Sequence, residues 1–196
     1  MVKFFKYIEH RWFKTRTIYS IDMNGVFSQE INHMKIIRVA QIHELKDYTL
    51  PHQVSKIKWK ERLNNGSQLW AVIIDNALVA YQWVLMPREK LVWHDSLPIR
   101  HNELRIYNVW TEPDYRNKGL ISSLKRKVLS DLINEGYKFI TVVIEDSNHH
   151  AIKADKKSGF KPYKKNYLIK LNGKNIISTI GLSELYFLYG ERKNKL

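Results

Sequence analysis

Short apolar runs and one longer helical repeat divide the chain into elements. Runs rich in β-branched and aromatic residues, bounded by Asn, Asp, Gly or Pro, predict strands. These strands are expected at residues 35–40, 69–74, 78–85, 104–111, 139–144 and 167–171. From residue 119 the period changes, because Leu120, Leu124, Val128 and Leu132 recur at helical spacing as far as residue 134. An amphipathic helix is therefore expected over residues 119–134.

The order of these elements predicts an α/β fold. Further helical segments are expected at residues 43–48, 53–63 and 148–157. The order is then strand, two helices, three strands, helix, strand, helix, strand. We interpret it as a mixed, mostly antiparallel central sheet flanked by helices. Residues 88–102 carry no clean period, so we expect a loop or an irregular strand there.

Three regions are expected along the chain. Residues 1–33 form an N-terminal extension, in which Asn24-Gly25 predicts a β-hairpin between residues 17–21 and 26–27. Residues 34–172 form the main domain. Residues 173–196 form a C-terminal tail, with a helix at residues 183–189 and a basic end.

Composition excludes some kinds of site and indicates the location and the binding partners of the protein. The 196 residues include no Cys, which removes disulfides, thiolate nucleophiles and Cys-based zinc sites. No apolar run approaches the roughly 18 residues of a membrane span, and the N-terminus lacks a signal peptide's apolar segment, so a cytoplasmic protein is expected. The 33 Lys and Arg against 19 Asp and Glu give a net charge of +14. Such a surface attracts phosphates, nucleic acid or anionic lipid.

The segment after the strand at 104–111 carries candidate chemistry. A turn with Arg116, Lys118 and Gly119 leads directly into the amphipathic helix. Free N–H groups at a helix N-terminus, a Gly that allows close approach and two cations make a cradle suited to a pyrophosphate. Neither the Walker pattern nor Gly-x-Gly-x-x-Gly is present. The alternative interpretation is an ordinary strand-to-helix turn with solvated basic residues.

A second motif follows the strand at 139–144. Asn148 opens a helix as a cap, and Gly159-Phe160 ends it with a core anchor. Together, the two motifs resemble the GNAT N-acetyltransferase superfamily from about residue 34 to residue 171. The matching residues are Arg116, Gly119, Asn148, Ala151, Gly159 and Phe160. A weaker likeness points to members of bacterial cell-surface sugar pathways.

This resemblance implies transfer of an acetyl group from acetyl-CoA to a primary amine, without a metal. It implies that backbone groups of the strand end pair with the pantetheine arm, that N–H groups of the turn hold the pyrophosphate, and that the second motif contacts the other end of the arm. The implied binding positions are Val109, Trp110, Thr111, Arg116, Asn117, Lys118, Gly119, Leu120, Ile121 and Asn148.

Two positions depart from the family pattern. Ile121 stands where many members have Gly or Ala. Asp155 stands where many members have a Tyr that is assigned to protonate the departing CoA thiolate. Because a carboxyl group with an ordinary pKa of about 3.9 is ionised at neutral pH, Asp155 is a poor substitute for that Tyr.

Candidates for the base come from the strand before the turn. Strict alternation places Glu103, Arg105, Tyr107, Val109 and Thr111 on one face. Among them we select Tyr107 and Glu103 as candidate catalytic residues, with a water relay or a neutral amine as alternatives. In the irregular segment, His94 is a candidate substrate contact.

The remaining aromatic and basic residues have simpler interpretations. Five Trp residues are expected in the core or at its rim, in preference to a stacking platform: Trp59, Trp70, Trp83, Trp93 and Trp110. Lys125, Arg126 and Lys127 are expected on a solvated basic face that helps to attract CoA.

The expected function is therefore an acetyl-CoA-dependent N-acyltransferase that acts on a small amine such as an amino sugar. Alternatives are an acceptor amine on a protein or an aminoacyl-tRNA, a non-catalytic acyl-CoA-binding or interaction protein, and a peripheral membrane role. Binding of nucleic acid is not favoured. A monomer or a homodimer is expected.

Overall fold

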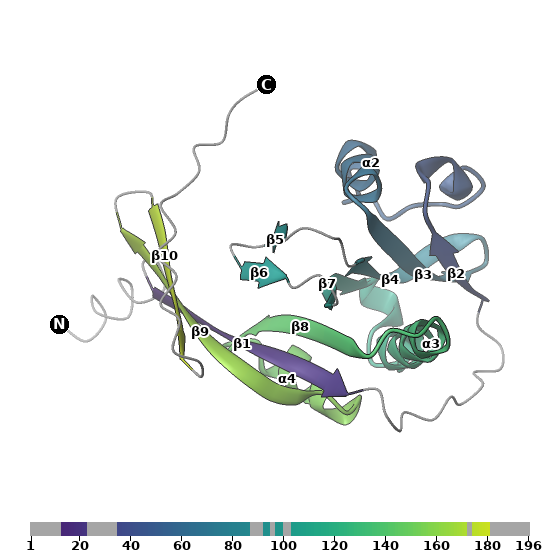
Figure 1. Cartoon of the computed structure of the whole chain (residues 1–196). Coiled ribbons are helices and arrows are strands. Elements are labelled where there is room, and N and C mark those ends of the chain that lie inside the picture. The colour runs from purple at the N-terminus through teal and green to yellow at the C-terminus, as the bar shows by residue number, and fades with distance from the viewer. Residues whose placement is uncertain are drawn as a thin grey trace. The chain divides into compact units, whose positions relative to one another are not determined.

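The computed structural model describes residues 13–22, 35–86, 92–94, 97–99, 103–171 and 174–180 (Figure 1). The chain divides into two compact units. The first, called the main unit, contains Ile21–Val92 and Ile99–Val142. The second, called the terminal unit, contains Met1–Ser20, Trp93–Pro98 and Val143–Leu196.

The main unit is built on a mixed, mostly antiparallel sheet. Its strands are β2 (Lys35–Val39), β3 (Ser67–Ile74), β4 (Ala77–Leu85), β7 (Leu104–Thr111) and the first part of β8 (Phe139–Glu145). They lie in the order β8-β7-β4-β3-β2. The pair β7 and β8 is parallel, and the other neighbours are antiparallel. The fold class expected from the sequence is confirmed.

Helices cover both faces of this sheet. They are η1 (Ile42–Leu45), α2 (Lys56–Asn64), η2 (Pro113–Tyr115) and α3 (Leu120–Asn134). The helix α2 packs on β3, whereas α3 packs on β3, β4 and β7 from the opposite side (Figure 1). The helix α2 begins at Lys56 because the Ser55 side chain caps it by accepting a hydrogen bond from the Lys58 N–H at 3.4 Å.

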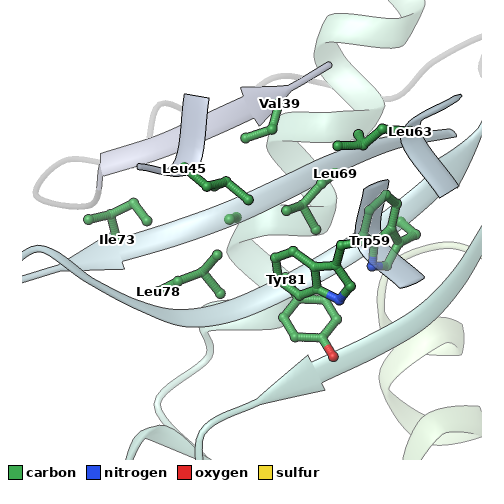
Figure 2. Close-up of a cluster of buried hydrophobic side chains, with 10 residues drawn as sticks. Val39, Leu45, Trp59, Leu63, Leu69, Ile73, Leu78 and Tyr81 are labelled. Carbon is green, nitrogen blue, oxygen red and sulfur yellow. The ribbon is translucent and has the colours of Figure 1, made fainter. Parts of the chain in front are cut away.

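A hydrophobic cluster lies between α2, η1 and the sheet (Figure 2). Trp59 from α2 meets the ring of Tyr81 edge-on at 5.1 Å and that of Trp83 at 5.5 Å. Leu69, on β3, is fully buried. The expectation of core aromatics is confirmed for Trp59, Trp83 and also Trp70, which is 2% exposed.

The terminal unit is built on a three-stranded antiparallel sheet. Its elements are β1 (Phe13–Asp22), β9 (Lys161–Leu171), β10 (Lys174–Ile180), α4 (His149–Lys157) and the end of β8. The strand β9 lies between β1 and β10. The short strands β5 (Val92–His94) and β6 (Leu97–Ile99) pair with each other.

Polar contacts fix the end of β8 in this unit. Thr17 donates a hydrogen bond from its Oγ1 to Asp146 at 2.7 Å, and Lys165 forms an ion pair with the same carboxylate at 3.1 Å. Arg16 lies 3.5 Å from Glu145. These contacts link β1 and β9 to the turn that follows β8.

Both ends of the chain differ from the expectation. The strand β1 contains the first arm of the expected hairpin, but it pairs with β9, and the second arm lies outside the described residues. The strand β10 occupies part of a tail for which only a helix was expected, and that helix, at 183–189, lies outside the described residues. The signal for β10 is Asn172-Gly173, which separates the paired residues Leu171 and Lys174.

The irregular segment expected at 88–102 contains the short strands β5 and β6. Residues 87–91, 95–96 and 100–102 lie outside the described part. Within the described part of the chain, none of the helices has the length and apolar character that crossing a membrane requires.

Candidate active site

The strand β7 contains a bulge near its middle. Tyr107 pairs with Trp83, and Trp110 pairs with Tyr81, so three steps along β7 match two steps along β4. One residue of β7 is therefore extra. Asn108 lies at this point with a φ of +47°, in the left-handed region that Asn tolerates better than most residues. The bulge redirects the second half of the strand.

This bulge corrects the strict alternation expected along β7. Tyr107 pairs with Trp83 and Trp110 with Tyr81, so both lie on the face that packs against the hydrophobic cluster. Thr111 pairs with Ala80 and lies on the other face from Tyr107. The common face expected for Glu103, Arg105, Tyr107, Val109 and Thr111 therefore ends at Tyr107. A residue that the bulge shifts outward is Val109, which is 38% exposed.

The ladder between β7 and β8 is short. Leu104, Arg105 and Ile106 pair in parallel with Ile140, Thr141 and Val142. Further along β7, Trp110 and Thr111 pair with Tyr81 and Ala80 of β4. The strand then leads directly into the turn that precedes α3.

The turn between β7 and α3 is held by backbone contacts. The Glu112 N–H donates to the Val79 carbonyl at 2.8 Å, and Pro113–Tyr115 form the single turn η2. The Arg116 Nε donates to the Thr111 carbonyl at 3.2 Å, which holds the exposed guanidinium beside the end of β7. The ammonium of Lys118 lies 4.8 Å from the centre of the Tyr115 ring.

The N-terminus of α3 has no side-chain cap. Its N-cap is Gly119, with a φ of +75°. The Ser123 N–H bonds to the Gly119 carbonyl, and helix geometry leaves the N–H groups of residues 120–122 without an acceptor in the helix. A Cβ added to Gly119 would meet no atom within 4 Å. Exposed N–H groups, open space and the cations Arg116 and Lys118 together fit an anion.

The other expected positions in this turn differ in exposure. Asn117 has a φ of +61° and is exposed. Leu120 is 6% exposed and anchors the helix in the core, whereas Ile121 is half-buried. The half-buried side chain of Ile121 does not remove a donor, because the backbone N–H of this residue still belongs to the first turn of α3.

Tyr107 lies in a polar corner that sequence reasoning missed. Its hydroxyl donates a hydrogen bond to the Ser67 Oγ at 2.8 Å. The guanidinium of Arg62 lies 5.5 Å from the centre of the Tyr107 ring and 5.2 Å from that of Trp83. With the Asn108 amide turned so that its oxygen faces Arg62, that oxygen accepts from both terminal nitrogens of the guanidinium. Only Asn108, a turn-forming residue inside a strand pattern, gave a signal in the sequence.

Glu103 is part of a buried network at the start of β7. Its Oε1 accepts hydrogen bonds from Arg105 and from the Thr141 hydroxyl, each at 2.6 Å. The three residues are 5%, 1% and 1% exposed, respectively. The Glu103 carboxylate is thus engaged in an ion pair that joins β7 to β8.

The second motif forms the start and end of α4 in the terminal unit. The Asn148 side-chain oxygen accepts the Ala151 N–H at 3.1 Å, which is the cap expected from the sequence. Asp155 and Phe160 are buried, at 4% and 2% exposure. His94 is half-buried in β5.

Lys125 corrects the expectation of a solvated basic face on α3. Arg126 and Lys127 are exposed as expected, but Lys125 is 3% exposed. Burial lowers the pKa of Lys125 from 10.5 to about 7, because desolvation disfavours the charged ammonium.

Comparison with known proteins gives a family match over most of the main unit and beyond. Residues 35–160 match the sequence profile of the Acetyltransferase (GNAT) family. Among curated proteins, none matches the chain.

Solved structures share the fold. A putative acetyltransferase of the GNAT family from Novosphingobium aromaticivorans has 22% identity and a TM-score of 0.54, over 79% of this chain and 62% of that one. A GCN5-related N-acetyltransferase from Sphaerobacter thermophilus has 11% identity and a TM-score of 0.53, over 85% of this chain and 55% of that one.

An IAA acetyltransferase from Bacillus cereus has 14% identity and a TM-score of 0.50, over 67% of this chain and 79% of that one. The chain spans only 62%, 52% and 55% of the first three solved structures that it matches.

Proposed function

Because the chain belongs to the GNAT acetyltransferase family, whose general reaction is acyl transfer from acetyl-CoA, we propose that it acetylates a primary amine of a small molecule. The observation that carries this proposal is the sequence of bulge, turn and uncapped helix from Asn108 to Ile121. It supplies a strand edge and an anion site in one continuous segment. An amino sugar is the acceptor that the weaker sequence likeness favours.

The turn before α3 suits the pyrophosphate of CoA. The N–H groups from Arg116 to Ile121 would contact its oxygens, and Arg116 and Lys118 would balance its charge. The backbone of Val109–Thr111, which follows the bulge, would pair with the pantetheine arm. For Asn148, which caps α4 in the terminal unit, a contact with CoA stays a prediction from the sequence.

The bulge in β7 is the place we assign to the reaction itself. The amine nitrogen attacks the thioester carbon, a C–N bond forms, the C–S bond breaks and CoA leaves as the thiol after gaining a proton. A backbone N–H of β7 would polarise the carbonyl oxygen. Holding the amine against the thioester would lower the activation barrier further, because the two reactants no longer have to meet in the correct orientation.

Two proton transfers are needed, from the amine and to the thiolate, and few side chains near the bulge can take part in them. Tyr107 has its hydroxyl on Ser67, so the pair offers a route by which the proton of the amine reaches water. Glu103 is the weaker candidate, because its carboxylate is already bound to Arg105. Asp155 is buried in the terminal unit and would be a poor acid when ionised, so water is the proposed proton donor to the thiolate.

Turnover and binding together test the proposed function. We expect acetyl-CoA to bind by calorimetry, and free thiol to be released with at least one member of a panel of small amines and amino sugars. Binding without turnover on any amine would instead favour a non-catalytic acyl-CoA-binding protein. The buried Asp155 is the observation that supports that second candidate.

Arg116→Ala tests the placement of the pyrophosphate. A charge-assisted hydrogen bond contributes about 1.5–3 kcal/mol, so we expect acetyl-CoA affinity to fall by roughly 10-fold or more. The control is Lys58→Ala, which removes an exposed cation from α2, on the other face of the sheet from α3. Equal affinity of the two variants for acetyl-CoA would reject this placement.

A further inference from the structure

We propose that Arg62 binds a carboxylate group on the acceptor amine, so that the acceptor is an amino acid or a related amino carboxylic acid. This inference rests on the proposed function, because it assumes that the acceptor lies beside the bulge in β7. It concerns a residue that no sequence motif singled out.

Arg62 is held in place on the wall formed by α2, β4 and β7. It lies in the last turn of α2 and is half-buried. Its guanidinium lies over the rings of Trp83 and Tyr107, at 5.2 and 5.5 Å from their centres. The Asn108 amide oxygen takes hydrogen bonds from its terminal nitrogens. The cation is thus directed to the bulge itself.

The surroundings of this guanidinium differ from those of two other Arg residues in the main unit. Arg38 is paired with Glu135, and Arg105 is paired with Glu103. Arg62 contacts two rings and a neutral amide, and among the residues that the structure describes no carboxylate pairs with it. A half-buried cation with neutral partners gains most from an anion supplied by a ligand.

The geometry favours a carboxylate over other anions. The Asn108 oxygen takes one N–H from each terminal nitrogen of Arg62, which leaves the Nε–H and a second N–H on each terminal nitrogen. These donors lie in the guanidinium plane and suit a bidentate pair with a planar carboxylate. The side chains that share the corner are neutral, namely Ser67, Tyr107 and Asn108. A single cation suits a monoanion, whereas a diphosphate calls for the several donors and the two cations found at the N-terminus of α3.

The charge of Arg62 also reaches a neighbouring ring. Burial raises the pKa of the Tyr81 hydroxyl, and the positive charge of Arg62 opposes this rise. Tyr81 stacks on Trp110 at 5.4 Å, with 29° between the ring planes. Tyr81 is buried in the hydrophobic cluster, at 6% exposure, whereas Trp110 is half-buried. Trp110 is therefore the ring that an apolar or ring portion of the acceptor would meet.

The experiment measures binding of matched pairs of amines to the protein loaded with CoA. Each pair is an L-amino acid and its carboxamide, which keeps the amine and the side chain but removes the negative charge. Calorimetry is run on the parent protein, on Arg62→Gln and on Arg62→Lys. The control is Lys60→Gln, which removes the same charge from an exposed position of the same helix.

For the parent protein and Lys60→Gln, we expect at least one amino acid to bind tenfold or more tightly than its carboxamide. Arg62→Gln should bind both members of that pair equally, and Arg62→Lys should keep only part of the preference. CoA affinity should be the same in all four proteins, which shows that the variants fold and that the nucleotide site is intact.

Equal binding of acids and carboxamides by the parent protein, or no binding of any acid, would overturn the inference. So would a preference for the acid that survives in Arg62→Gln. Tighter binding of a phosphorylated amino sugar than of any amino acid would also overturn it. These outcomes differ from failure of the proposed function, which is an absence of thiol release with every amine, whatever its charge.

Discussion

Single residues in unusual backbone conformations gather around the candidate active site. Of the described non-glycine residues with positive φ, Asn108 and Asn117 lie in the bulge and the turn, and Gly119 follows them. The other two, Asp75 and Asn76, form the tight turn between β3 and β4. In residues other than glycine, a positive φ costs conformational energy, and such residues are found more often at binding sites than elsewhere. Gly119 is the position where this can be tested.

Gly119→Ala should lower the free energy of unfolding by about 1–2 kcal/mol, because a Cβ disfavours the left-handed conformation at its φ of +75°. Acetyl-CoA affinity should fall as well, since the first turn of α3 would shift. The matched control is Gly136→Ala, at the other end of the helix, with a φ of +88° and equally open surroundings. It should lose similar stability in urea unfolding but keep its CoA affinity. Loss of affinity in both variants would contradict a local role for Gly119.

Lys125→Met tests a buried charge. The pKa of the Lys125 amine is about 7 in the folded protein and near 10.5 in the unfolded chain. Between these two pH values the amine is protonated in the unfolded chain and mostly neutral in the folded protein. The unfolded state therefore binds more protons between these values, and stability rises with pH across this window. Lys125→Met removes this dependence, so at pH 7 it should be more stable than the parent by about 1 kcal/mol or more.

The advantage of Lys125→Met should shrink as the pH approaches 10. Urea unfolding at several pH values measures it, with the exposed Lys127→Met as the control. A constant difference between Lys125→Met and the parent at all pH values would show that the ammonium is not desolvated in the folded protein.

At the scale of elements, the sequence predicted strands and helices well where one period ran without interruption. The strand β7 was expected at 104–111 and is Leu104–Thr111, and α3 was expected from 119 and begins at Leu120. The bulge was missed because strict alternation allows no extra residue. The strand β10 was missed because it forms by pairing with β9, and β9 itself extends well beyond the apolar run at 167–171 from which it was predicted.

Asn108→Val tests the bulge as an element of the site. A β-branched residue at a φ of +47° should lower the free energy of unfolding by about 1–2 kcal/mol and reduce turnover, because β7 would lose the bend. Asn108→Gly also removes the amide but accepts positive φ, so it should keep most of the stability and more of the turnover. Urea unfolding and thiol release measure both effects. If the Val and Gly variants behaved alike, the amide rather than the backbone shape would be what matters.

For the whole molecule, the two motifs and the order of the elements predicted the family, but the pairing of strands that are distant in the sequence could not be predicted. The family match over residues 35–160 confirms the resemblance to the GNAT superfamily, whereas the roles of Arg116, Gly119 and Asn148 stay predictions. The partner of β1 could not be predicted, because pairing between strands at opposite ends of the chain depends on the folded sheet and not on local pattern. For the same reason, the corner of Arg62, Ser67, Tyr107 and Asn108 was not visible in the sequence.

The net charge of +14 leads to a prediction about ionic strength. Screening weakens the attraction between CoA phosphates and a basic surface, so the KM for acetyl-CoA should rise by about 3-fold or more between roughly 50 and 500 mM salt. The kcat should change much less. In Arg116→Ala the rise in KM should be smaller, because one of the attracting charges is gone. A KM that does not depend on salt would show that exposed cations contribute little to the encounter.

The pairing of β1 with β9 determines the order in which the chain can fold as it is synthesised. Phe13 pairs with Ile169, so β1 needs a partner strand that the ribosome makes about 156 residues later. The segments of the main unit are complete once Val142 has emerged. Until β9 follows, the edge of β1 that β9 will cover is open to other nascent chains. The strand β1 is thus exposed throughout the synthesis of the main unit, so protection of its open edge matters until β9 is made.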